Sequence, residues 1–132
     1  MRGAVLLVVD RPGPRAQYAE HLRANELRVY EAESTEGALK HLTEMTPDVI
    51  VTDFRLDDGP TMIQELRRRA DHATSIIVVS APDHQELVRT AGADCLVPET
   101  VRPADILYEI HRALIMRRSG RRLPGNWQRN RK

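Results

Sequence analysis

Short apolar runs alternate with helix-like patterns along the chain, and this alternation limits the fold more than any other feature. After each apolar run, apolar side chains recur every three or four residues, the spacing of one helix face. Parallel strands need a crossover between them, usually a helix, so the alternation predicts an α/β domain with a parallel sheet. The predicted strands are residues 4–9, 28–32, 48–52, 75–79 and 95–97.

The length of 132 residues fits one domain with one core. Two strand orders are common for open parallel sheets, and the five-stranded order 2-1-3-4-5 fits this length. We therefore expect a doubly wound sheet with five helices distributed over its two faces. The glycines form neither a G-x-G-x-x-G nor a G-x-x-x-x-G-K-[ST] pattern, which argues against a dinucleotide or P-loop nucleotide site.

The formal net charge of +1 is unevenly distributed. Residues 117–132 carry seven basic side chains and no acidic one, which leaves thirteen basic and nineteen acidic side chains, a charge of −6, on residues 1–116. A basic end of this kind can bind nucleic acid, or it can simply be solvated.

The composition also changes near residue 118. Gly120, Pro124 and Gly125 argue against a helix that continues past this point. We therefore expect a folded domain at residues 1–118, followed by a basic, flexible tail at residues 119–132.

Cysteine and histidine usage suggests no disulfide or metal chemistry. Cys95 is the one cysteine, so no internal disulfide can form, and it is most simply a buried apolar residue. No signal-like segment or apolar run near 18 residues is present, so we expect a cytoplasmic protein that does not insert into membranes. The five histidines show no metal-like pairing, and we expect them at the surface or on helix faces: His21, His41, His72, His84 and His111.

Polar side chains follow the predicted strands where each one ends. Asp10 and Arg11 follow the first strand, Asp53 the third, Ser80 the fourth and Glu99 the fifth. The first, third and fourth strands are neighbours in the expected order, so Asp10, Asp53 and Ser80 should meet in one crevice at the carboxyl edge of the sheet. An aspartate at a strand end also suits a turn, but this arrangement makes Asp53 a candidate nucleophile or metal ligand.

The order and spacing of these pieces resemble the receiver domain of two-component response regulators, the chemotaxis-type phosphoacceptor module. The likeness runs from residue 4 to about residue 118. It is carried by LLVVD at 6–10, DFRL at 53–56 with DG at 58–59, IVVSA at 77–81, and GAD at 92–94. The resemblance implies a flavodoxin-like fold.

The resemblance also implies a function in a phosphorelay. Asp53 would accept a phosphoryl group from a histidine kinase or phosphotransfer protein, and the Ser80 hydroxyl would bind that group. The surface of the fourth helix, fifth strand and fifth helix would then change its affinity for a downstream protein or for a second copy. Such a domain is not an enzyme beyond assisting its own phosphorylation and dephosphorylation. Family members hold Mg²⁺ with residues that correspond to Asp10, Asp53 and the backbone carbonyl of Arg55.

The sequence departs from the family pattern at two positions of this site. Arg11 replaces a second acid, and Glu99 stands where the family carries a lysine. Asp10, Asp53 and Glu99 then face only Arg11, a sum of −2, and phosphorylation adds roughly −1.5 to −2 more. We therefore expect weakened Mg²⁺ binding. Glu99 could become a ligand, Arg11 could act as a resident cation, or Arg11 could point to solvent.

Two alternatives stay open at this point. The first is a degenerate pseudo-receiver that binds a protein partner independently of phosphorylation. The second is a nucleic-acid-associated protein that uses its basic tail.

Overall fold

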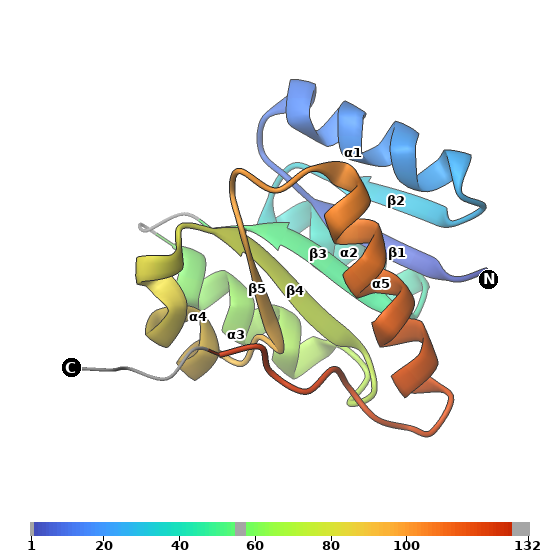
Figure 1. Ribbon diagram of the computed structural model, residues 1–132. Helices are drawn as coiled ribbons and strands as arrows, with labels where there is room; N and C mark the ends of the chain where they lie inside the picture. The colour runs from blue at the N-terminus through green and yellow to red at the C-terminus, as the bar shows by residue number, and fades with distance from the viewer. Residues whose placement is uncertain (1, 55–57, 128–132) are drawn as a thin grey trace.

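The computed structural model describes residues 2–54 and 58–127. Within these ranges, five parallel strands form one sheet in the order β2-β1-β3-β4-β5 (Figure 1). The predicted strand order is therefore confirmed. The strands are β1 (Ala4–Val8), β2 (Arg28–Ala32), β3 (Val49–Asp53), β4 (Ser75–Ser80) and β5 (Cys95–Pro98).

Helices join successive strands, and α1 and α5 lie on the opposite face of the sheet from α2, α3 and α4 (Figure 1). A short 3₁₀ turn, η1, precedes α4. The five predicted helices are present in the described residues. They are α1 (Pro12–Ala24), α2 (Thr35–Glu44), α3 (Gly59–Arg69), α4 (Gln85–Ala91, after η1 at Pro82–His84) and α5 (Pro103–Arg117).

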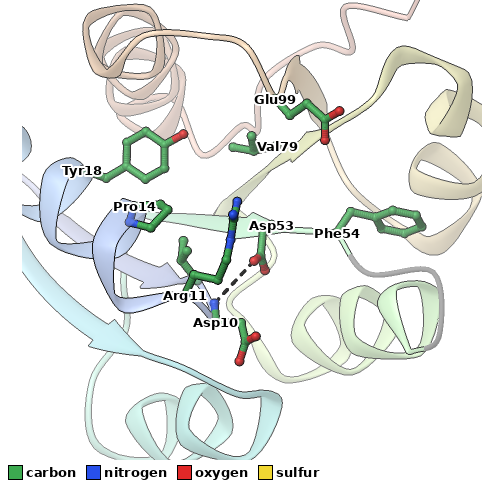
Figure 2. A pocket seen from close by; sticks show the side chains of 9 residues that line it. Asp10, Arg11, Pro14, Tyr18, Asp53, Phe54, Val79 and Glu99 are labelled. Atoms are coloured by element: carbon green, nitrogen blue, oxygen red, sulfur yellow. Dashed lines mark hydrogen bonds between the residues drawn. The ribbon is translucent and has the colours of Figure 1, made fainter.

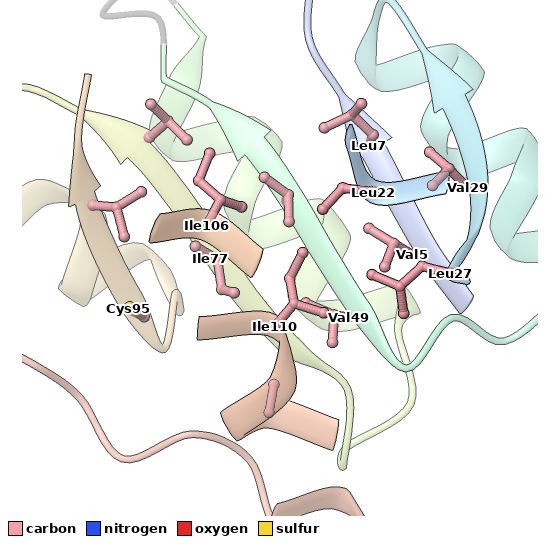
Figure 3. Packing of buried hydrophobic residues seen from close by; sticks show 14 of the residues in the cluster. Val5, Leu7, Leu22, Leu27, Val29, Val49, Ile77, Cys95, Ile106 and Ile110 are labelled. Atoms are coloured by element: carbon pink, nitrogen blue, oxygen red, sulfur yellow. The ribbon is translucent and has the colours of Figure 1, made fainter. Parts of the chain in front are cut away.

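The central strands are apolar over most of their length because helices cover the sheet on both faces. Successive side chains point to opposite faces, so β1 supplies Val5 and Leu7 to one core and Leu6 and Val8 to the other. We call these cores the α1/α5 cluster and the α2–α4 cluster, after the helices that complete them. Figure 3 shows the α1/α5 cluster, in which Ile110 lies fully buried against the sheet.

Local signals set several helix ends. The Ser34 side chain accepts a hydrogen bond from the Gly37 N–H at 3.1 Å and caps α2. Gly92 ends α4 with φ of 116°, a conformation that side chains with a Cβ rarely adopt. No helix in the described ranges is both long and apolar enough to cross a membrane.

The segment after α5 differs from the expected flexible tail at residues 119–132. Residues 121–127 contact the domain beside β5, and Leu123 is buried at 4% exposure. As expected, α5 ends at Arg117, before Gly120 and Pro124, but an extended chain can still bind the open edge of a strand. Residues 128–132 of the expected tail lie outside the described residues.

Candidate functional site

A pocket of about 320 Å³ opens at the carboxyl edge of the sheet (Figure 2). The end of β3, the chain after β1, the start of α1 and the loop after β5 all contribute to it. Four of the residues predicted from the sequence meet here. The lining residues are Val9, Asp10, Arg11, Pro14, Tyr18, Asp53, Phe54, Val79 and Glu99.

Asp53 is the last residue of β3 and lies half-buried in this pocket. The preceding strand residues are fully buried, so the chain delivers this carboxylate where it leaves the core. The backbone N–H of Asp10 donates to Asp53 Oδ2 at 3.4 Å. This contact ties the ends of β1 and β3 together and keeps the carboxylate at the opening.

The side chain of Arg11 extends from the start of α1 into the pocket beside Asp53 (Figure 2). Arg11 thus lines the pocket while remaining exposed to solvent. Tyr18 faces the same space from the next turns of α1. Burial raises the pKa of Tyr18, the positive charge of Arg11 opposes that rise, and the negative charge of Asp53 adds to it.

Sequence reasoning missed Tyr18, although a signal existed. Arg11, Pro14 and Tyr18 are separated by three and four residues, the spacing of one helix face. Arg11 and Pro14 follow the end of β1, which lines the site. Tyr18 lies on the same face of α1 and therefore lines the pocket as well.

Asp53 lines two pockets, and each of them contains further carboxylates. Glu99 lines the large pocket from the loop after β5. A smaller pocket of about 60 Å³ is lined by Asp10 and Asp53 together with Glu33 and Asp58. Among the described residues that line either pocket, Arg11 supplies the only positive charge, so the site is more acidic than the sequence count indicated.

Ser80 does not line the pocket. It is the last residue of β4 and is buried at 3% exposure, while its neighbour Val79 faces the cavity. Ser80 Oγ instead forms a 2.8 Å hydrogen bond with Nδ1 of His84, the last residue of η1. The His84 ring also lies 5.1 Å from the ring of Phe54, the residue after Asp53. His84 is half-buried in η1, and its bond to Ser80 is a contact that hydrophobic periodicity did not indicate.

The described residues do not by themselves form the divalent-cation site that the family implies. No group of three or more His, Cys, Asp or Glu side chains among them is placed to hold a metal ion. The Arg11 guanidinium extends into the pocket at the position where a second acid was expected. The predicted carbonyl ligand, Arg55, lies outside the described residues.

Fold and site together define a small, doubly wound α/β domain of flavodoxin-like type with an acidic pocket at its strand ends. The model of the response regulator receiver domain family matches residues 5–110. The chain belongs to this family. Receiver domains are signalling modules of two-component systems, which interact with histidine kinases or phosphotransfer proteins and with downstream effectors.

The chain is also similar to a curated relative, the transcriptional activator protein ExaE of Pseudomonas putida. The two are 33% identical over 117 residues, which cover 83% of this chain and 54% of the relative. The chain thus spans about half the length of the curated relative that it matches.

Two solved structures illustrate the fold. A CheY-like receiver domain protein from Methanospirillum hungatei JF-1 superposes with a TM-score of 0.81 at 18% identity, covering 91% of this chain and 99% of the other. The chemotaxis response regulator CheY4 of Vibrio cholerae gives a TM-score of 0.75 at 20% identity, covering 86% and 99%.

Proposed function

We propose that this domain accepts a phosphoryl group on Asp53 in a two-component phosphorelay. The observation that carries the proposal is the half-buried Asp53 carboxylate at the end of β3, opening into a pocket of about 320 Å³. An oxygen of Asp53 attacks the phosphorus of a phosphohistidine on the partner. A P–O bond forms, the P–N bond breaks, and the imidazole leaves with its electron pair and takes a proton from solvent.

Arg11 is the group of the described site that can offset the incoming charge. Its guanidinium extends beside Asp53 and can donate to phosphoryl oxygens in the planar, forked geometry that suits phosphate. Receiver domains typically use Mg²⁺ for this purpose. We infer that Mg²⁺ binds weakly here, because the cationic side chain of Arg11 lies beside Asp53 and the family's second acid is absent.

Ser80 provides the switch in this proposal. Its hydroxyl is bonded to His84, so binding a phosphoryl oxygen requires it to leave that partner and turn toward Asp53. His84 ends η1, which leads directly into α4. The exchange of partners therefore releases the turn that positions α4, and this gives the site two states of the kind that phosphorylation can bias.

The surface that would respond is formed by α4, β5 and α5. Leu87 on α4 is 50% exposed and Tyr108 on α5 is 63% exposed. Tyrosine is enriched among the anchors of protein–protein contacts, and an exposed leucine beside it adds apolar area. We propose that a downstream protein or a second copy binds there, while the kinase or phosphotransfer protein approaches the pocket of Asp53.

Beryllofluoride, which mimics an aspartyl phosphate, tests the acceptor role directly. We expect amide NMR signals of Asp53, Ser80 and α4 to shift on addition of beryllofluoride with Mg²⁺. The Asp53→Asn variant, which keeps the shape of the side chain, should show no shift. A wild-type protein that does not respond at millimolar concentrations would instead support the phosphorylation-independent binding module, which the accessible carboxylate disfavours.

A further inference from the structure

The chain after α5 crosses the open edge of β5, from one face of the sheet to the other. Leu123 packs in the α1/α5 cluster, whereas Trp127 packs against the α2–α4 cluster. The three residues between these two anchors pass beside β5, the last strand of the sheet. The segment formed by residues 121–127 therefore binds both layers of the domain.

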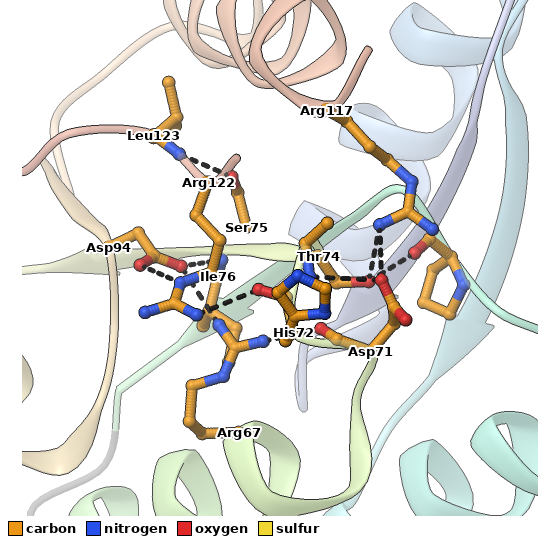
Figure 4. Close-up of polar contacts among 12 residues, drawn as sticks. Arg67, Asp71, His72, Thr74, Ser75, Ile76, Asp94, Arg117, Arg122 and Leu123 are labelled. Carbon is orange, nitrogen blue, oxygen red and sulfur yellow. Dashed lines mark hydrogen bonds and ion pairs between the residues drawn. The ribbon is translucent and has the colours of Figure 1, made fainter. Parts of the chain in front are cut away.

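Specific polar contacts hold the first half of this segment (Figure 4). The Leu123 N–H donates to Ser75 Oγ at 2.9 Å, in a buried position. Arg122 Nε donates to Asp94 Oδ1 at 2.8 Å, and its Nη1 donates to the His72 carbonyl at 2.9 Å. The Asp94 side chain is 8% exposed and that of Arg122 is 40% exposed, so the carboxylate is shielded from water whereas the guanidinium remains partly solvated.

The second half of the segment imitates a neighbouring strand. The Leu96 N–H donates to Asn126 Oδ1 at 3.1 Å, and Asn126 Nδ2 donates to the Leu96 carbonyl at 2.8 Å. One carboxamide thus satisfies both main-chain groups of an edge residue, as a paired strand would. Pro98, further along β5, has no N–H to offer. The segment and the proline together close this edge.

We propose that the edge of β5 is a docking surface for an extended peptide, and that its occupant is residues 121–127 of the same chain. The surface recognises three features: an arginine for Asp94, an apolar side chain after it, and a carboxamide three residues further on for Leu96. Another segment can add to β5 only after this one leaves. The inference goes beyond the phosphorelay proposal and does not depend on phosphorylation.

The contacts predict reversible rather than permanent docking. Asp94 also accepts hydrogen bonds from Arg67 Nη1 at 3.2 Å and from the Ile76 N–H at 2.8 Å. Arg122 therefore shares one carboxylate with a second guanidinium, which limits its net contribution. The segment is tethered to α5, and this offsets the weak ion pair, because a short linker gives an effective concentration in the millimolar range.

Two neighbouring arginines provide a matched test in the full chain. Arg122→Ala removes the contact with Asp94, whereas Arg121→Ala removes the same charge from an exposed position. We expect hydrogen exchange at the Leu96 amide to rise about tenfold in Arg122→Ala and in Asn126→Ala, which removes the oxygen that accepts from this amide. The amide of Ile77, inside the sheet, should not change. Equal effects of the two arginine variants, or an unprotected Leu96 amide in the wild type, would overturn the proposal.

A synthetic peptide of residues 119–132 tests recognition in trans. Added at millimolar concentration to the Arg122→Ala protein, it should restore protection of the Leu96 amide, and a peptide with Asn126→Ala should not. Failure of both peptides would contradict a docking surface. Light scattering should show a monomer; a dimer that dissociates in Arg122→Ala would assign the segment to a second copy and overturn the intramolecular occupant.

Discussion

The hydroxyl of Ser80 and the imidazole of His84 lie 2.8 Å apart, and this bond directs the proposed switch residue away from the pocket of Asp53. While the Ser80 hydroxyl donates to His84 Nδ1, its one proton is not available to a phosphoryl oxygen. The energy of the Ser80–His84 bond therefore opposes activation, and removing His84 should favour the active state.

We expect His84→Ala to lower the beryllofluoride concentration needed for half-saturation by about fivefold, because one hydrogen bond contributes about 1 kcal/mol. The change is measured from the amide shifts of the α4 residues during titration. His84→Asn, which retains a hydrogen-bonding group near the position of Nδ1, should remain close to the wild type. If the alanine variant titrates like the wild type, the Ser80–His84 bond does not restrain the switch.

The pocket charges predict a gain of metal binding in a double variant. Arg11→Asp with Glu99→Lys restores the second acid and the lysine of the family pattern without changing the net charge of the chain. We expect Mg²⁺ affinity, measured by calorimetry, to rise by at least about tenfold, because a carboxylate ligand replaces a cation beside Asp53. Glu99→Lys alone adds a cation and should not raise it. Unchanged affinity in the double variant would refute the charge argument.

Topology explains why much of the site could be predicted from the sequence. The apolar runs and the intervening helices define a parallel sheet, and in such a sheet the carboxyl ends of the strands face one crevice. Asp10, Arg11, Asp53 and Glu99 follow three strands, so their meeting requires only the strand order. Their distances and the direction of Arg11 depend on side-chain packing that no sequence spacing encodes.

The contacts that were not predicted depend on side-chain conformation or on long-range pairing. The bond from Ser80 to His84 requires the turn η1, whose geometry is not visible in hydrophobic periodicity. Asn126 binds Leu96 across 30 residues through a side chain, and this leaves no periodic pattern either. Glycine and proline near residue 120 correctly indicated the end of the helix, but they say nothing of where the extended chain binds.

Two glycines allow a matched test of backbone strain. Gly92 has φ of 116°, and a Cβ there would lie 3.0 Å from Arg67 Cγ, next to the ion pair with Asp94. Gly13 lies in α1, and a Cβ there would meet no atom within 4 Å. We expect Gly92→Ala to lower the free energy of unfolding by about 1–2 kcal/mol and Gly13→Ala to leave it unchanged or raise it by up to about 1 kcal/mol. Urea denaturation measures both, and equal effects would contradict the assignment of strain to Gly92.

Tyr18 predicts a pH dependence of stability that originates in the pocket. Burial raises the pKa of its phenol above the ordinary value near 10, so the folded state favours the protonated form. The stabilisation is fully present below the pKa of the unfolded chain and is lost as the pH rises through the folded-state pKa. As the pH rises above about 10, the free energy of unfolding should therefore fall more steeply in the wild type than in Tyr18→Phe, as followed by urea denaturation.

The charges around Tyr18 make the same titration a probe of the pocket. Asp53 raises the pKa of Tyr18 and Arg11 lowers it, so Asp53→Asn should shift the tyrosinate absorbance of Tyr18 to lower pH and Arg11→Ala should shift it to higher pH. The absorbance of the Tyr18→Phe variant isolates this residue from the other two tyrosines. Shifts of opposite sign are expected only if both charges face the phenol across one cavity. If both variants titrate like the wild type, Tyr18 does not face Asp53 and Arg11 across the pocket.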